Sequence, residues 1–144
     1  MNNLRILTEE ELLAMPQSSY MNAEQLAFFK QLLKTQREEV TEHLQTLRQD
    51  IITPAEQGDE TDKATLEEEK ALLLRQADRE TKLLKKIDDA LERIESGDYG
   101  YCEETGEPIG LRRLLLRPTA ELTLEAKQLQ EEQEHHYAKQ RMNY

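Results

Sequence analysis

Two aspartates near the middle of the chain have residue types and a spacing that could do chemistry. Asp59 and Asp62 stand in the pattern D-x-x-D-x-A, which ends at Ala64. Acids at the start of a helix commonly cap its free N–H groups and complement its dipole, and for an arbitrary hairpin this is the favoured interpretation. If the two aspartates lie at the tip of a long helical hairpin, as argued below, their carboxylates could instead act on a bound metal ion or a mobile loop that a globular protein cannot reach.

A second pattern has the spacing of a zinc site without its ligands. Cys102-x-x-Thr105 is followed, after seventeen intervening residues, by Thr123-x-x-Ala126. Cysteine at all four positions would be a strong signal for structural zinc. Because only Cys102 can supply a thiolate, we expect no tight zinc site, and we interpret Cys102 as a small buried or half-buried residue.

A line of cations occupies one face of a predicted helix. Arg75, Arg79, Lys82 and Lys86 follow one another at steps of four, three and four. Such a line is usually the solvated flank of a coiled coil, whose cations pair with acids across the seam. No histidine has a Cys or His partner at ligand spacing, so surface positions are expected for all three: His43, His135 and His136. No catalytic motif is present, and the sequence does not predict an enzyme.

The overall composition limits the possible partners. The chain has 144 residues, with 30 acidic and 19 basic side chains and a formal charge of −11. Such an acidic chain is not expected to bind nucleic acid by itself, because phosphates repel carboxylates. A protein partner, or a small anion in a local basic pocket, is favoured. A single cysteine, acids in the N-terminal stretch and no apolar run of about 20 residues together indicate a cytoplasmic protein.

Two long segments must position these groups, and both have the apolar spacing of a coiled-coil seam. The first begins at Asn22 and the second runs from near Asp62 to Ile94, with Pro54 and Gly58 marking a turn between them. The first seam contains Leu26, Phe29, Leu33, Val40, Leu44, Leu47 and Ile51, and the second contains Leu66, Leu73, Ala77, Leu84, Ile87 and Leu91.

The two seams match if the chain folds back near residue 58. Phe29 then faces Ile87, Ile51 faces Leu66, and Gln36 lies opposite Glu80 in one polar layer. This match predicts an intramolecular antiparallel coiled coil over residues 22–96, with its tip near 53–63.

The remaining segments predict a small globular domain. Residues 1–21 contain a short helix with a capping box of Thr8 and Glu11, and are expected to pack with that domain. In residues 97–144, the glycines predict turns and a short strand pair, followed by a last helix with Pro118 in its first turn and a frayed polar tail. The fold is therefore expected to be mainly α.

Taken together, these stretches resemble the DksA family of bacterial transcription factors over nearly the whole chain after Tyr20. The resemblance is carried by YMNAEQLAFFKQLL, the D-x-x-D-x-A tip, DRETKLLKKID, and GDYGYCEETGEPIGLRRLLLRPTAEL as far as Lys127. Typical members have zinc-binding cysteines at the positions of Cys102, Thr105, Thr123 and Ala126. The departure here resembles the zinc-independent branch of the family in pseudomonads, which implies no structural zinc and no tightly bound cofactor. Packing would then replace the metal, through Ile109, Leu111, Leu114, Leu115, Leu116 and Leu122, with Tyr99 or Tyr101 as a lid.

The resemblance also implies a function. Family members bind RNA polymerase without binding promoter DNA and insert the coiled coil into its secondary channel. There, Asp59, Asp62 and Ala64 would act on the catalytic elements and destabilise open complexes, which represses ribosomal RNA promoters and activates some amino-acid promoters in the stringent response. The alarmone ppGpp would bind at the polymerase interface, as a co-effector of a monomeric protein. Matching positions are Leu83, Lys86, Arg117 and Lys127, and Arg79 is a possible polymerase contact.

Two alternatives stay open from the residues. A Gre-like transcript-cleavage factor also presents acids at a coiled-coil tip, where they stabilise a catalytic Mg²⁺. In that family, however, the hairpin comes first and a β-rich domain follows it. A structural or chaperone-like coiled-coil protein is less favoured, because the turn-rich segment and the matched seams within one chain argue against it.

Overall fold

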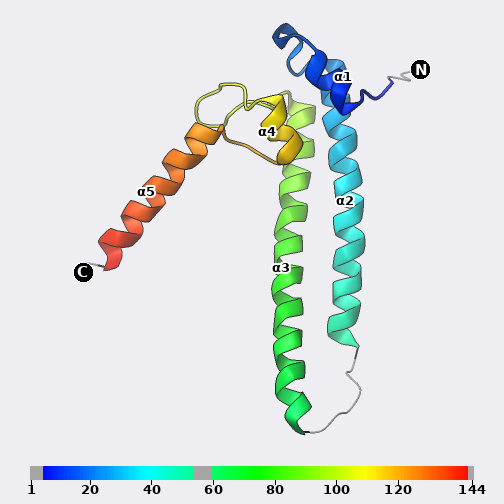
Figure 1. Ribbon diagram of the computed structural model, residues 1–144, viewed down its shortest axis with the longest axis vertical. Helices are drawn as coiled ribbons and strands as arrows, with labels where there is room; N and C mark the ends of the chain where they lie inside the picture. The colour runs from blue at the N-terminus through cyan, green and yellow to red at the C-terminus, as the bar shows by residue number, and fades with distance from the viewer. Residues whose placement is uncertain (1–4, 54–59, 143–144) are drawn as a thin grey trace.

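Two long antiparallel helices dominate the computed structural model, which describes residues 5–53 and 60–142, with the side chains of residues 60–62 excepted. Helix α2 spans Ala23–Ile52 and helix α3 spans Glu60–Ser96, and they lie side by side along most of their length (Figure 1). At a rise of about 1.5 Å per residue, they are about 45 and 55 Å long. The predicted mainly α fold with an antiparallel coiled-coil hairpin is confirmed.

The seam of the coiled coil is the one that the apolar spacing predicts. Asn22 caps α2 as expected, its side-chain oxygen accepting a hydrogen bond from the Gln25 N–H at 2.9 Å. Every predicted seam residue is buried or half-buried in the structure. Those that are buried are Phe29, Leu33, Val40, Leu44, Leu47 and Ile87.

The predicted register between the two helices is wrong by about one heptad. Gln36 was expected opposite Glu80, but Glu80 pairs with His43 at 3.3 Å, seven residues further along α2. The ion pair of Arg37 with Asp88 at 2.7 Å is displaced from the expected register in the same direction and by a similar number of residues. Helix α3 continues past the end of α2 at the tip (Figure 1), so the hairpin does not fold back symmetrically. A shift of seven residues brings the same faces together, which is why the apolar pattern alone did not detect it.

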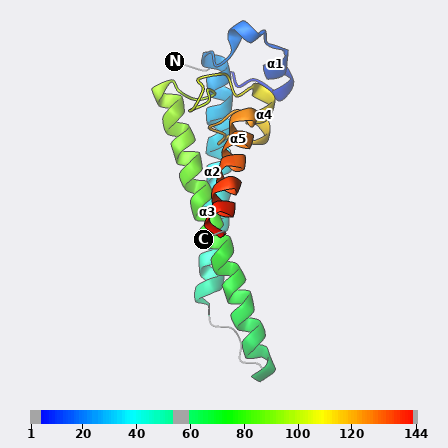
Figure 2. The ribbon, with the colours of Figure 1, turned by 90° about the vertical axis from the view of Figure 1, so that its left-hand side faces the viewer.

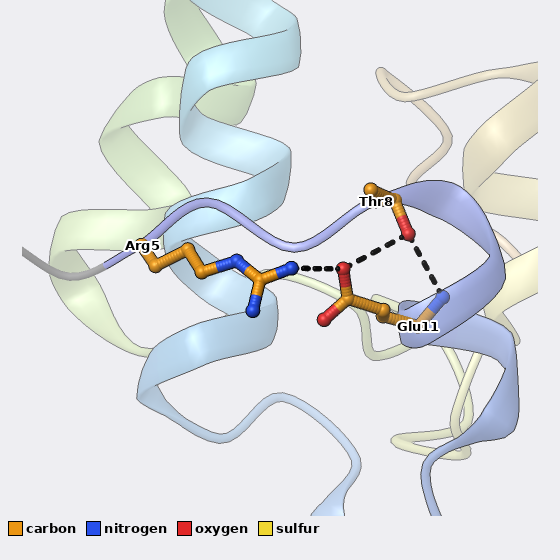
Figure 3. Close-up of polar contacts among 3 residues, drawn as sticks. All are labelled: Arg5, Thr8 and Glu11. Carbon is orange, nitrogen blue, oxygen red and sulfur yellow. Dashed lines mark hydrogen bonds and ion pairs between the residues drawn. The ribbon is translucent and has the colours of Figure 1, made fainter.

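The N-terminal segment packs on the end of the coiled coil opposite the tip. Helix α1 spans Glu9–Ala14, followed by the 3-10 turn η1 at Gln17–Ser19. The predicted capping box is present: the Thr8 hydroxyl accepts from the Glu11 N–H at 3.2 Å and donates to the Glu11 carboxylate at 3.2 Å (Figure 3). Arg5 pairs with the same carboxylate at 2.9 Å.

The N-terminal segment is tied to the turn-rich segment by one tyrosine and one close approach. The Tyr20 hydroxyl donates to the Gly100 carbonyl at 2.6 Å and accepts from the Gly110 N–H at 2.9 Å. Gly100 has a φ of 91°, and a Cβ there would lie 2.7 Å from Met21 Cγ, so only glycine fits. Leu12 of α1 is fully buried in the same hydrophobic core as Phe29.

The turn-rich segment contains one isolated bridge in place of the predicted strand pair. Within the described residues, Tyr101 and Pro108 form that bridge and no strand is present. Pro108 has no N–H, so it cannot extend a ladder. Helix α4 follows at Leu111–Leu116. Tyr99 is fully buried and donates its hydroxyl to the Pro118 carbonyl at 2.8 Å, and burial raises its pKa.

Three expectations for the C-terminal segment are wrong. Leu116 was expected in the core, but it is 85% exposed, whereas Leu114 on the inner side of α4 is fully buried. Pro118 lies in a turn before helix α5, which begins only at Leu124 and spans Leu124–Met142. The tail expected to fray is helical as far as Met142. Helix α5 starts at the end of the coiled coil opposite the tip, which we call the head of the molecule. It diverges from α2 and α3 in Figure 1, and in Figure 2, turned by 90°, it lies in front of them. None of the helices in the described ranges is long and apolar enough to cross a membrane.

Candidate functional site

A cavity of about 570 Å³ lies beside the end of the coiled coil opposite the tip, where α3, α4 and the start of α5 meet. We call this cavity the basic pocket. Its lining includes six cations, Lys82, Lys85, Lys86, Arg113, Arg117 and Lys127, and four carboxylates, Asp89, Glu103, Glu104 and Glu121. The local excess of cations contrasts with the formal charge of −11 on the whole chain.

The loop between α4 and α5 holds the pocket together. Arg113 Nε donates to the Leu122 carbonyl at 3.0 Å, which ties α4 to the segment just before α5. Arg117 ends α4, with its N–H bonded to the Arg113 carbonyl at 2.7 Å. Lys127 stands in the first turn of α5, and its N–H donates to the Thr123 carbonyl at 2.9 Å. The three cations are therefore placed by backbone structure that is itself hydrogen-bonded.

Two of the carboxylates in the same pocket, Glu103 and Glu121, lie close together. Glu103 and Glu121 come together because the Glu103 N–H donates to the Glu121 carbonyl at 2.9 Å. Partial burial, followed by the nearby Glu103 charge, raises the pKa of Glu121 above its usual range, while Arg93 opposes that shift. Cations at this density can bind a polyanion such as a phosphorylated ligand, because charge-assisted hydrogen bonds to phosphate are strong and directional.

Three of the four residues expected to bind an alarmone line the basic pocket. Lys86, Arg117 and Lys127 come from α3, the end of α4 and the start of α5. Leu83 is half-buried and packs against the hydrophobic core instead. Arg79 lies on the exposed surface of α3 and does not line this pocket.

Sequence reasoning missed two cations of the pocket and underrated a third. Lys85 is adjacent to Lys86, and Arg113 precedes Arg117 by four residues, so a helical spacing could have found Arg113. Lys82 was interpreted as part of the solvated line on α3, and it does pair with Asp78 at 3.0 Å. It nevertheless also lines the pocket.

The coiled-coil tip is described only in part. Asp59 lies outside the described residues, and for Asp62 the structure describes the helical backbone of α3 but not the side chain. Ala64 is exposed in the first turns of α3. The tip is about 36 Å from Lys86 along the helix, at about 1.5 Å per residue.

The positions that correspond to a four-cysteine zinc site are occupied by three buried residues and one exposed residue, Thr105, which are linked to the backbone and to each other by hydrogen bonds. The Thr123 hydroxyl caps α5 by accepting from the Ala126 N–H at 3.2 Å, and it lies 3.9 Å from Cys102 Sγ. The Thr105 hydroxyl accepts from the Glu107 N–H at 3.3 Å. Cys102, Thr123 and Ala126 are all buried. One thiol, two hydroxyls already used by the backbone and a methyl group do not fit tetrahedral zinc.

The Cys102 thiol is nevertheless perturbed by these residues. Burial raises its pKa, but hydrogen bonds from the Thr105 hydroxyl and from backbone N–H groups, that of Thr123 first, outweigh it and lower the pKa to about 7. Among the described residues, no group of three or more His, Cys, Asp or Glu side chains is placed to hold a metal ion.

Two protein-family models match the chain in adjacent segments. The model described as DnaK suppressor protein DksA, N-terminal domain, matches residues 25–94, and the model described as prokaryotic dksA/traR C4-type zinc finger matches residues 97–132. The second match covers the segment in which Cys102 is the single cysteine.

Individual relatives cover most of the chain. The RNA polymerase-binding transcription factor DksA of Caulobacter vibrioides (strain NA1000 / CB15N) is 47% identical over 80% of this chain and 82% of its own. The factor of the same name from Escherichia coli (strain K12) is 43% identical over 81% of this chain and 78% of its own. The solved structure of transcription factor DksA2 from Pseudomonas aeruginosa is 51% identical, with a TM-score of 0.78 over 89% of this chain and 99% of that one.

Proposed function

Because the chain belongs to the DksA family, we propose that it is a transcription regulator that binds RNA polymerase and acts together with ppGpp. The coiled coil enters the secondary channel of polymerase and brings the tip near the active site. There the tip destabilises open promoter complexes. Ribosomal RNA promoters, whose open complexes are short-lived, are repressed, and some amino-acid promoters are activated.

The shape of the molecule supports the first part of this proposal. Helices α2 and α3 form a rod whose far end is narrow, with α3 reaching beyond α2 (Figure 1). Helices α1 and α4 and the start of α5 lie at the other end (Figure 1). In the proposal, Asp62 and Ala64 act on the mobile catalytic elements of polymerase, with Asp59 beside them, while Arg79 contacts polymerase along the rod.

The convergence of three cations on one cavity is the single observation that carries the ppGpp proposal. Lys86, Arg117 and Lys127 are far apart in sequence and come from three helices, yet they line the same pocket. The nucleotide has two diphosphate groups, which such cations bind well. Leu83 does not line the pocket, but it lies on the same helix as Lys86 and packs against the hydrophobic core, so it would help to hold this part of α3 in place.

The proposal includes independence from structural zinc. Thr105 and Thr123 stand where typical family members have zinc-binding cysteines. Each accepts a hydrogen bond from a nearby backbone N–H, of Glu107 and Ala126 respectively. Ile109 and Leu114 are buried there, and Leu111 and Leu115 are half-buried against the same core. The fold of this segment therefore has a source of stability that does not depend on a metal ion.

The ppGpp proposal is tested by measuring how much additional ppGpp binds when the protein joins purified RNA polymerase. Lys127→Ala and Arg117→Ala should each weaken that additional binding about tenfold, because a hydrogen bond to a charged group contributes about 1.5–3 kcal/mol. Lys139→Ala is the matched control, since Lys139 is an exposed lysine of α5 outside the pocket. Equal ppGpp binding by all three variants would contradict the assignment of the pocket.

A further inference from the structure

Three exposed leucines from distant parts of the chain line a second cavity. Leu13 of α1 is 39% exposed, Leu116 of α4 is 85% exposed and Leu124 of α5 is 52% exposed. All three line a groove of about 1170 Å³ together with Tyr20 and other residues. We call it the leucine groove. Large apolar side chains gathered on one exposed surface are typical of a site that contacts another molecule.

The position of Leu116 is not explained by the packing of the head. Leu114, two residues earlier, is fully buried, so α4 already anchors itself to the core through its inner side. Leu116 lies at the end of α4, on the side that lines the groove. The core does not need the Leu116 side chain, which is 85% exposed and could therefore fill a hollow in a partner.

The charges around the leucine groove indicate what kind of partner fits. Three arginines of the α4 region line it, Arg112, Arg113 and Arg117. Two carboxylates, Glu107 and Glu125, also line it, so the groove has a small excess of positive charge on a strongly acidic chain. A segment with apolar side chains flanked by carboxylates complements this surface, because arginine pairs with carboxylates in a bidentate geometry.

The leucine groove is continuous with the basic pocket. Arg113 and Arg117 line both cavities, so a protein that covers one of them extends over the edge of the other. From this continuity and the charge of the groove, we propose that the leucine groove binds an acidic, apolar segment of RNA polymerase. The inference rests on the proposed function, and it assigns a contact at the head of the molecule that is separate from the tip.

Affinity measurements with charge-reversing variants test this contact. Leu116→Glu and Leu124→Glu should each raise the Kd for purified RNA polymerase about tenfold or more, since each puts a carboxylate where an acidic segment must dock. Leu129→Glu is the matched control, because Leu129 is a 54% exposed leucine of α5 that does not line the groove. It should bind like the wild type. All three sites are exposed, so thermal unfolding should be unchanged, which separates lost binding from lost folding.

A photo-crosslinking amino acid in place of Leu116 identifies the occupant. The expected product is a cross-link to a polymerase subunit. The same photo-crosslinking amino acid in place of Leu129 should give no such cross-link. A cross-link to a second copy of this chain would overturn the inference, as would Kd values for Leu116→Glu and Leu124→Glu equal to that of Leu129→Glu. In those cases the proposed function stands if the wild type still binds polymerase. A wild type that does not bind polymerase would contradict both.

Discussion

Thr123 shows at the scale of single residues how a position that resembles a zinc ligand site is used differently. Its hydroxyl accepts the Ala126 N–H at the start of α5, and it also lies 3.9 Å from Cys102 Sγ. A cysteine there would bind metal, whereas threonine is a good N-cap. In this chain, the start of α5 is therefore fixed by a hydrogen bond from the backbone to a side chain.

Thr123→Ala should lower the free energy of unfolding by about 1 kcal/mol, which is the usual cost of losing an N-cap. Thr123→Ser should retain most of the stability, since serine caps equally well. Urea unfolding measures the free energy of unfolding of both variants. Thr46→Ala is the control, because Thr46 lies on the exposed side of α2 and its hydroxyl donates to the Glu42 carbonyl of the same helix. A loss for Thr123→Ala no greater than for Thr46→Ala would show that the cap does not contribute.

Cys102 gives a pH dependence with a definite sign. Its pKa in the folded protein is lowered from 9.0 to about 7, so the folded state favours the thiolate. The resulting stabilisation is complete above the unfolded pKa and is lost as the pH falls through about 7. Between these two values, the free energy of unfolding of the wild type should rise with pH relative to Cys102→Ser. Urea unfolding at several pH values in that range measures this difference. If the free energies of unfolding of the two proteins changed equally with pH, the lowered pKa of Cys102 would be contradicted.

At the scale of elements, the coiled coil is stabilised by its seam rather than by its surface leucines. Leu33 of α2 is fully buried in the core, whereas Leu74 of α3 is 52% exposed. Leu33→Ala should therefore lower the free energy of unfolding by about 2–5 kcal/mol. Leu74→Ala, the same chemical change on the outside, should cost less than about 1 kcal/mol. Similar losses from the two variants in chemical denaturation would mean that α2 and α3 pack differently.

The apolar spacing predicted the faces of α2 and α3 but not their register. Heptad repeats place Phe29 and Leu33 on the buried side whichever heptad lies opposite, so a slip of seven residues leaves the pattern intact. The contacts of Arg37 with Asp88 and of His43 with Glu80 distinguish the two registers, and many such polar pairs are possible in a chain with so many charges. Capping residues predicted the starts of α1 and α2 well, because a cap is a local feature.

The candidate site was predictable only where residues could be carried over from the family resemblance. That resemblance placed Lys86, Arg117 and Lys127 together, but spacing alone does not connect three helices. Arg113 was missed although it precedes Arg117 by one helical turn, and its bond to the Leu122 carbonyl exists only in the folded loop. Leu116 was assigned to the core because a run of three leucines does not show which one the last turn of α4 leaves exposed.

At the scale of the whole molecule, α3 connects the proposed site of action with the proposed site of regulation. Its first turns carry Asp62 and Ala64, and its later turns supply Lys82, Lys85 and Lys86 to the basic pocket. One continuous helix of 37 residues therefore fixes the distance between tip and pocket. In the proposal, the tip acts near the active site of polymerase while ppGpp binds at the basic pocket, at the other end of the same helix.

The most direct test is multiple-round transcription from a ribosomal RNA promoter with purified RNA polymerase, with and without ppGpp. The protein is first treated with chelator and its metal content is measured. The metal-free wild type should repress transcription, and ppGpp should strengthen the repression. Asp62→Asn should lose repression while it still binds polymerase. Failure of the metal-free wild type to repress despite measurable polymerase binding, or full repression by Asp62→Asn, would contradict the account.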